Sequence, residues 1–337
     1  MTPGRLDEIL ARAPAKRIVV IGDLMLDEFV WGKVGRISPE APVPVVEVTG
    51  ESFYPGGAAN VARNLREFVD HAAVIGVVGP DHGGRQLRAL LAEWKIDTAG
   101  TIEDPEFQTI VKTRIIARHQ QIVRVDREQV RAPNPEQVAQ VTAQVRNLLP
   151  KIDAIIFEDY GKGFLSAELV RQICQDARSA GKIVAADPNL RHPIEWRNAS
   201  VVKPNRSEAF SAAGVPWRDP VDPVEEDTEL LKAGATLLER WETQLLLITL
   251  GEQGMMLFQK GEPAHHIPTK ARQVFDVSGA GDTAIALFTL ALCCDASPVE
   301  AAEIANYASA VVVGKLGTAT ATAEELRASF QNDASAA

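Results

Sequence analysis

The stretch DVSGAGDTAIALF, at residues 276–288, combines three small residues with a carboxylate at the start of an apolar run. Glycine is a poor helix former, so Gly279 and Gly281 weaken the helix that the apolar residues predict. Small residues, here with Ala280 between the glycines, also let backbone N–H groups face one ligand beside the positive end of the helix dipole. The stretch therefore predicts an anion-binding turn.

Asp282 follows this turn directly. A carboxylate beside bound phosphate is unfavourable unless it takes part in the chemistry, for example by accepting a proton from an attacking hydroxyl. The structural alternative is that Asp282 only caps the helix or complements its dipole. G-x-x-x-x-G-K-[ST] is absent and no G-x-G-x-x-G follows the first predicted strand, so neither a P-loop enzyme nor a Rossmann dinucleotide fold is predicted.

Two glycines and an asparagine precede another predicted helix, in PGGAANVARNL at residues 55–65. Gly56 and Gly57 would let a hydroxylated ligand approach the backbone closely, and Asn60 can both donate and accept hydrogen bonds. A plain turn with an N-cap explains the same residues, so the motif alone leaves both interpretations open.

Two further polar motifs follow predicted strands. In KPNRSE, Glu208 can hold Mg²⁺ through a water molecule and the amide of Asn205 can reach a phosphate oxygen. The alternative is a capping box in which Asn205 starts a helix, and both interpretations can hold at once. In DYGKG, Asp159 and Lys162 predict either a ligand site or a salt bridge.

Strands and helices that alternate along most of the chain must position these motifs. The predicted buried strands are 17–23, 72–79, 152–159, 181–188, 200–205 and 245–254. The predicted helices are 60–69, 84–94, 166–180, 223–241, 281–294, 298–313 and about 322–330. This alternation predicts an α/β fold with a central, mainly parallel sheet and helices on both faces.

Two β-rich inserts, at about 30–55 and 108–126, interrupt the alternation. The second has the period-two pattern of a half-exposed antiparallel hairpin, and the prolines of residues 42–48 suit an edge strand in the first. We expect the inserts to form a small β-sheet lid on one domain that spans residues 1–337.

The composition argues against several classes of protein. A formal net charge of −10 disfavours a general nucleic-acid-binding protein, which needs a basic face. No apolar run of about 18 residues is present to span a membrane, and the N-terminus lacks the apolar region of a signal peptide. The three cysteines form no metal-binding pattern. We expect a cytoplasmic protein without nucleic-acid or membrane partners.

Together, the motifs resemble those of the ribokinase-like (PfkB) sugar kinases in order and spacing over nearly the whole chain. DVSGAGD resembles the D-T-x-G-A-G-D signature of that family, PGGAANVARNL its N-terminal glycine-rich signature, and KPNRSE its N-x-x-E motif. The resemblance implies a ribokinase-like fold and an ATP- and Mg²⁺-dependent phosphotransferase whose acceptor is a sugar hydroxyl.

The resemblance also implies roles on the acceptor side of the reaction. Asp282 would be the general base for the sugar hydroxyl. The N–H groups of Gly279, Ala280 and Gly281 would stabilise charge on the γ-phosphoryl group during transfer. Asp27 resembles the carboxylate that holds sugar hydroxyls, although an ordinary loop acid is the alternative.

For ATP, TLGEQG resembles the family's stretch along the ribose and phosphates, which implicates Thr249, Gly251 and Gly254. Asn306 would meet the adenine, although an asparagine on a solvated helix face is the alternative. Asn205 and Glu208 would handle ATP and the metal.

Four stretches resemble one group of this family, the kinases that phosphorylate D-glycero-D-manno-heptose 7-phosphate at its C1 hydroxyl in bacterial ADP-heptose synthesis. They are residues 22–48, 118–126, 159–163 and 311–320. The implied product is the 1,7-bisphosphate, a lipopolysaccharide core precursor. Some of these relatives carry a fused cytidylyltransferase-like domain; we expect only the kinase part here, and hence a separate nucleotidyltransferase.

A phosphorylated substrate needs a second cationic site, for which Lys112, Arg114, Arg118 and Arg124 of the hairpin insert are candidates. Charges that alternate along a strand also fit a solvated face. Asp159 is a further candidate for the substrate. Another sugar or sugar phosphate as substrate, or a non-catalytic sugar or nucleotide sensor, remain alternatives, and the exposed surface of the lid predicts a homodimer.

Overall fold

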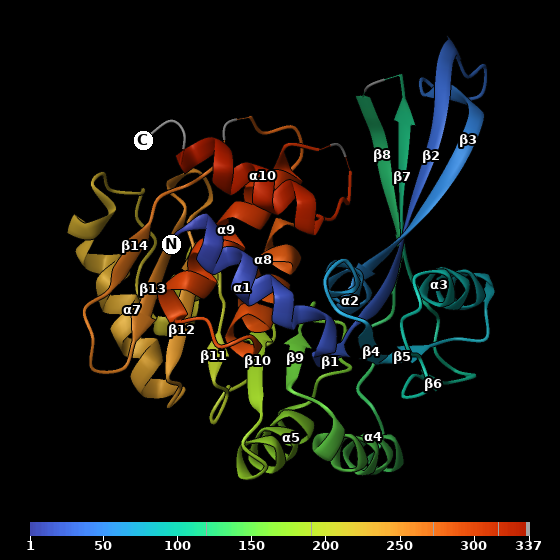
Figure 1. Cartoon of the computed structure of the whole chain (residues 1–337). Helices are drawn as coiled ribbons and strands as arrows, with labels where there is room; N and C mark the ends of the chain where they lie inside the picture. The colour runs from blue at the N-terminus through green and yellow to red at the C-terminus, as the bar shows by residue number, and fades with distance from the viewer. Residues whose placement is uncertain (119, 190, 272, 316, 335–337) are drawn as a thin grey trace.

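The computed structural model describes residues 1–118, 120–189, 191–271, 273–315 and 317–334, and within them an eight-stranded sheet forms the centre (Figure 1). Its order is β14-β13-β12-β11-β10-β9-β1-β4; the strands from β12 to β4 are parallel, and β13 and β14 complete the sheet antiparallel. The strands are β1 Arg17–Gly22, β4 His71–Ile75, β9 Ala154–Glu158, β10 Ile183–Asp187, β11 Val201–Val202, β12 Leu245–Thr249, β13 Met255–Gln259 and β14 His265–Ile267.

Helices cover both faces of this sheet because its strands are apolar on both sides. In β1, for example, Ile18 and Val20 pack into one core cluster, whereas Val19 and Ile21 pack into the other. The helices on the first side are α1 Pro3–Arg12, α2 Ala58–Arg66, α8 Ala280–Cys293, α9 Pro298–Val313 and α10 Ala323–Ala334. Those on the second side are α4 Pro135–Leu148, α5 Ala167–Ser179, α6 Arg206–Ala213 and α7 Thr228–Arg240.

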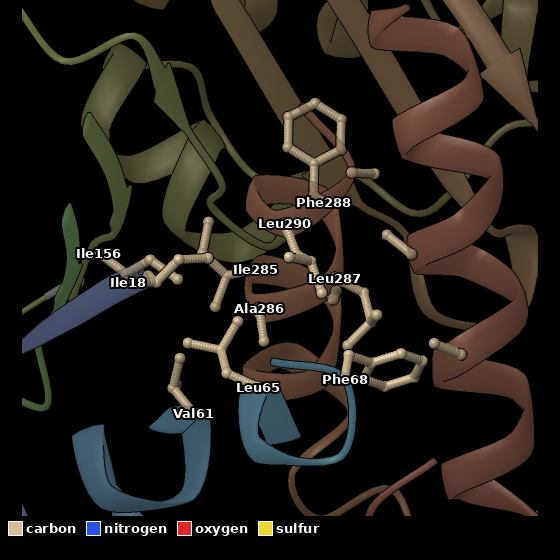
Figure 2. Close-up of a cluster of buried hydrophobic side chains, with 14 of the residues drawn as sticks. Ile18, Val61, Leu65, Phe68, Ile156, Ile285, Ala286, Leu287, Phe288 and Leu290 are labelled. Atoms are coloured by element: carbon tan, nitrogen blue, oxygen red, sulfur yellow. The ribbon is translucent and has the colours of Figure 1, made fainter. Parts of the chain in front are cut away.

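Helix α8 is buried on almost every side, which fixes the direction of its N-terminus. Figure 2 shows Ile285 beside Ile18 of β1 and Ile156 of β9, with side chains of α2 on another side of the helix. A helix that is apolar all round is typical of such a buried position. The packing therefore fixes the first turn of α8 at the carboxyl ends of the strands of the central sheet.

A second, four-stranded sheet with the order β3-β2-β7-β8 projects from the β4 side of the molecule (Figure 1). Its strands are β2 Leu24–Ile37, β3 Pro44–Gly57, β7 Ile110–Ala117 and β8 Gln120–Arg127. This is the predicted lid, but its first insert begins at Leu24, directly after β1, and so earlier than expected. Residue 119 of the second insert lies outside the described residues.

Smaller elements differ from the expectations. The strand predicted at 72–79 divides at Gly76, whose backbone passes so close to Leu24 that a Cβ would lie 2.5 Å from its side chain. The second half, β5 Val77–Val78, pairs with β6 Ile102–Glu103, near α3 His82–Glu93. Helices α1 and α4 were not predicted. Over the described ranges, no helix is long and apolar enough to cross a membrane.

Candidate active site

Asp282 lies in the first turn of α8, 5% exposed, with a hydrogen-bond donor on each carboxylate oxygen. Asn60 Nδ2 of α2 donates to Oδ2 at 2.6 Å, and the hydroxyl of Tyr160, which follows β9, donates to Oδ1 at 2.9 Å. Burial raises the pKa of Asp282, and these two hydrogen bonds and Lys203 oppose that rise. The carboxylate is thus held in one orientation, and each oxygen keeps a second lone pair for a ligand.

The turn before Asp282 has the geometry that its small residues predict. Gly279 is the N-cap of α8 with φ of 81°, a left-handed conformation that favours glycine. A Cβ on Gly279 would lie 3.0 Å from Asn60 Nδ2. One expectation needs correction: the N–H of Ala280 donates to the carbonyl of Val277 at 3.3 Å, so it is not a free donor. Within the described ranges, the N–H groups of Gly279 and Gly281 have no protein acceptor.

A buried lysine lies beside this turn. Lys203 Nζ is 2.8 Å from Oδ2 of Asp187, and a Cβ added to Gly281 would be 3.4 Å from the same Nζ. Burial would lower the pKa of Lys203, but the charge of Asp187 and its hydrogen bond raise it, so the charge of Lys203 is retained. The sequence analysis assigned no role to Lys203 or Asp187. Their place at the ends of buried strands was the signal that could have identified them.

Glu158 and Asp187 end the adjacent strands β9 and β10 and pair in register beneath this turn. Burial raises the pKa of Asp187 to about 7, and burial together with Asp187 and Asp282 raises that of Glu158 well above its usual value. Glu158 Oε2 is buried and has no hydrogen-bond partner in the described structure. Burial and the neighbouring carboxylates therefore favour the protonated form of Glu158.

The residues predicted to hold the sugar come together at the base of the lid. Asp27 of β2 forms an ion pair with Arg114 of β7, and a Cβ on Gly56 would lie 2.6 Å from Asp27 Oδ2. Gly57, with φ of 57°, similarly makes room for the carbonyl of Asp23. Both glycines therefore make room for the chain itself, and their contact with a ligand stays a prediction.

Asn60 contributes both to the base and to this pocket. Its side-chain nitrogen holds Asp282, whereas its Oδ1 is buried without a partner among the described residues. A buried amide oxygen without a donor is costly, and Oδ1 is free to accept a hydrogen bond from a hydroxyl group.

The four basic residues predicted to bind phosphate occupy different environments. Lys112 is half-buried, with Nζ 5.1 Å from the centre of the Tyr160 ring, and no carboxylate of the described chain lies within 4.0 Å of it. Arg114 is held by Asp27, and Arg124 is exposed and paired with Asp126 at 2.9 Å. Arg118 is exposed directly after β7, where its N–H donates to the carbonyl of Gly32 at 3.1 Å, so the structure does not bring it to the others.

Lys112 faces further positive charge. Lys162 and Arg124 lower its pKa in addition to burial, while Asp27 and Asp126 oppose this. Lys162 also lines a hollow of about 380 Å³ with Tyr160 and Arg191, where Glu128 pairs with it at 2.7 Å. Of these cations, Lys162 and Arg124 are paired with carboxylates, whereas Lys112 has no ion-pair partner among the described residues.

The loop after β9 is anchored by two carboxylates. Asp23, at the end of β1, accepts hydrogen bonds from the N–H groups of Tyr160, Lys162 and Phe164, at 3.0, 3.0 and 3.2 Å. Asp159 contacts His192 Nδ1 at 2.9 Å, and burial raises the pKa of Asp159 to about 6. Asp159, expected to bind substrate, therefore has its side chain engaged within the protein, and its ion-pair partner is not Lys162.

A cleft of about 500 Å³ lies on the other side of the α8 N-terminus. Its walls are largely apolar, as suits a base and ribose. They include every residue predicted from the ATP motif and part of the anion turn: Thr249, Gly251, Gly254, Asn306, Ala280 and Gly281. Asn306 Nδ2 donates to the carbonyl of Pro268 at 2.7 Å.

Asn205 and Glu208 form the capping box of α6. Asn205 Oδ1 accepts from the N–H of Glu208 at 2.9 Å, and Glu208 Oε2 accepts from the N–H of Asn205 at 2.7 Å. The other carboxylate oxygen, Oε1, has no hydrogen-bond partner in the part of the chain described. Glu208 also lines the 380 Å³ hollow. No group of three or more His, Cys, Asp or Glu side chains in those ranges can hold a metal by itself. The geometry fits an ion held mainly by phosphate and water.

Residues 15–325 match the family described as pfkB family carbohydrate kinase. The Bifunctional protein HldE of Desulfatibacillum aliphaticivorans is 41% identical over 316 residues, which cover 94% of this chain and 63% of that protein. The Bifunctional protein HldE of Helicobacter pylori is 42% identical over 311 residues, covering 92% and 65%. The chain thus spans less than two thirds of the length of these relatives.

Two solved structures share the fold. Phosphofructokinase-2 from Escherichia coli in complex with potassium has a TM-score of 0.76 and 20% identity, covering 94% of this chain and 99% of its own. Arabidopsis thaliana ribokinase complexed with ribose and ATP has a TM-score of 0.70 and 18% identity, with the same coverage. The chain belongs to the pfkB family of carbohydrate kinases, ATP-using phosphotransferases that act on a sugar hydroxyl, and the ribokinase-like fold prediction is confirmed.

Proposed function

We propose that this pfkB family member transfers the γ-phosphoryl group of ATP to the C1 hydroxyl of a heptose 7-phosphate, giving the 1,7-bisphosphate. The observation that carries the proposal is the position of Asp282. Its carboxylate stands at the N-terminus of a buried helix, with a nucleotide-sized cleft on one side and the base of the lid on the other. The motifs of the heptose 7-phosphate kinases and the relatives named Bifunctional protein HldE support the choice of sugar.

The chemical step needs a base and a place for negative charge. Asp282 accepts the proton of the sugar hydroxyl as its oxygen attacks the γ-phosphorus. A bond forms between that oxygen and the phosphorus, and the bond from the phosphorus to the bridging oxygen breaks, so that ADP leaves with this oxygen. The N–H groups of Gly279 and Gly281 and the ammonium group of Lys203 stabilise charge on the phosphoryl oxygens.

A magnesium ion would be held by the phosphates and, through water, by Oε1 of Glu208. When bound, it neutralises charge on the phosphate oxygens. Asn205 orients Glu208 through the capping box, so loss of either side chain disturbs this contact.

The phosphate already on the substrate would bind at Lys112 and Lys162. These cations lie near Tyr160, whose ring is 5.1 Å from Lys112 Nζ and whose hydroxyl contacts Asp282. A sugar that places its C1 hydroxyl at Asp282 can therefore present a distal phosphate to a cation across one aromatic ring. Arg114 instead orients Asp27 for sugar hydroxyls.

The lid would also make a homodimer. Val123 and Val125 of β8 are 45% and 42% exposed, and they alternate with Arg124 and Asp126, so they face away from the site. An exposed apolar strand face of this kind marks an interface.

The three cysteines are unpaired and buried, which fits a reducing cytoplasm. A separate nucleotidyltransferase stays a prediction.

A substrate panel tests the proposal. ADP release should be measured with ATP and Mg²⁺ for heptose 7-phosphate, unphosphorylated heptose, fructose 6-phosphate and ribose. We expect kcat/KM for heptose 7-phosphate to exceed that for the unphosphorylated heptose by at least about 100-fold, because the distal phosphate gains the charge of Lys112, which has no ion-pair partner among the described residues. A higher kcat/KM for a neutral sugar would contradict the proposed substrate. If no sugar gives ADP release, the sensor alternative is favoured.

A further inference from the structure

Tyr160 joins the two parts of the site, and no motif predicts a role for it. Its hydroxyl is the donor to Oδ1 of Asp282 at 2.9 Å, while Asn60 donates to Oδ2 at 2.6 Å. With one donor on each oxygen, rotation of the Asp282 carboxylate breaks both hydrogen bonds. Removing the Tyr160 hydroxyl would leave the carboxylate held on one side only.

Tyr160 is itself fixed from two directions. Its N–H donates to Oδ2 of Asp23, a carboxylate that is 2% exposed and also holds the N–H groups of Lys162 and Phe164. Lys112 Nζ lies over the ring, 5.1 Å from its centre. The position of the hydroxyl therefore follows from the end of β1 and from the lid together.

We propose that Tyr160 is a positioning residue for proton transfer: its hydroxyl orients the carboxylate of Asp282 and favours the ionised form that accepts the proton of the sugar. This inference rests on the proposed function, because it assumes that Asp282 is the base. Tyr160 does not take up that proton. Its hydroxyl remains a donor to the carboxylate before and after the transfer.

The charges around Asp282 show why a donor matters here. Lys203 is the positive group that faces it, whereas Asp27, Glu158 and Asp187 are acidic neighbours from β2, β9 and β10. Burial raises the pKa of Asp282 most, and Asp27 adds to that rise. Hydrogen bonds to the ionised form counteract both effects. Burial and Asp282 also keep the pKa of Tyr160 well above its usual value, so its hydroxyl stays protonated.

Tyr160→Phe tests the proposal, because it removes the donor and keeps the ring beneath Lys112. We expect the acidic limb of the kcat/KM pH profile to move up by about one pH unit, and kcat at neutral pH to fall about tenfold. The KM for ATP should stay within about twofold, because the nucleotide cleft is on the other side of α8. Thermal unfolding of the variant checks that the fold is retained.

Tyr160→Leu is the second variant, which removes the ring as well. It should move the acidic limb by the same amount and also raise the KM for the phosphorylated sugar, because Lys112 loses its support. An acidic limb and kcat equal to wild type in Tyr160→Phe would overturn the inference while leaving the kinase assignment intact. If the wild-type protein phosphorylates no sugar, it is instead the proposed function that fails.

Discussion

The two sides of the site differ in how they are built. On the transfer side, Asp282, Lys203 and Glu158 are all buried at the ends of a helix and strands of the main core. On the lid side, Arg124 and Asp126 lie on strands of a thin sheet that projects from that core (Figure 1), and every described residue of β8 is exposed.

This difference separates two tasks. Phosphoryl transfer needs charges that do not move during the reaction, and a packed core supplies them. Recognition of one sugar needs groups that can differ between relatives without disturbing the core, and an exposed sheet supplies those. We therefore expect substitutions on the transfer side to change kcat, and substitutions on the lid to change the choice of substrate.

Asp282→Asn should have the largest effect, because it removes the base and preserves the shape of the side chain. We expect kcat to fall about 1,000-fold or more, with ATP affinity by calorimetry within about twofold of wild type. Asp70→Asn, at an exposed surface position, is the matched control. Activity of the Asp282 variant within tenfold of wild type would mean that the transfer side does not depend on this carboxylate.

Lys112→Met tests whether the lid side binds the phosphate of the substrate. We expect the KM for the phosphorylated sugar to rise about 10- to 100-fold, because a hydrogen-bonded charge pair is lost, while the KM for ATP is unchanged. Lys33→Met, on the exposed part of β2, is the matched control and should behave as wild type. An equal loss with unphosphorylated sugar would show that Lys112 does not read the phosphate.

Val125→Glu tests whether the outer face of the lid makes a dimer. A charge buried in an apolar interface is strongly unfavourable, so we expect light scattering to show half the wild-type mass at the same concentration. Val130→Glu, 68% exposed but outside β8, should keep the wild-type mass. Unchanged mass in the Val125 variant, or a wild-type protein that is already monomeric, would rule out this interface.

Glu158→Gln should have the smallest effect on turnover, because burial at the end of β9 favours the neutral form of Glu158, which glutamine resembles. Its pKa is raised on folding, so the folded state binds more protons than the unfolded state and wild-type stability falls as pH rises above the usual glutamate value. Glutamine removes this penalty. We expect the unfolding temperature of the variant to exceed that of wild type by a few degrees at pH 8, and by less at pH 5.

The same difference in the unfolding temperature at pH 5 and pH 8 would contradict this account of Glu158. A loss of kcat comparable with that of Asp282→Asn would instead place Glu158 among the groups that act in the transfer step.

The sequence predicted those features that depend on local pattern. Alternating apolar runs were enough for the parallel sheet, and the small residues before Asp282 were enough for the turn, with Gly279 in the left-handed conformation. The capping box of Asn205 and Glu208 likewise follows from a spacing of three residues.

Contacts between distant segments were not predictable in this way. The Tyr160 hydroxyl meets Asp282 across 122 positions, and Lys203 reaches the anion turn only because the end of β11 and the N-terminus of α8 lie at the same edge of the sheet. The basic residues of the lid show the same limit, since Lys112, Arg114, Arg118 and Arg124 could not be told apart by their spacing. In the structure Arg114 pairs with Asp27, Arg118 is exposed beyond the end of β7, and Lys112 has no ion-pair partner among the described residues.

The position of the new phosphate shows which sugar hydroxyl lies at Asp282. After incubation of heptose 7-phosphate with ATP and Mg²⁺, phosphorus NMR with coupling to the sugar protons identifies the hydroxyl that has reacted. We expect a second phosphate coupled to the anomeric proton, and none of this product with Asp282→Asn. Phosphate on any other hydroxyl, or transfer only to sugars that carry no phosphate, would contradict it.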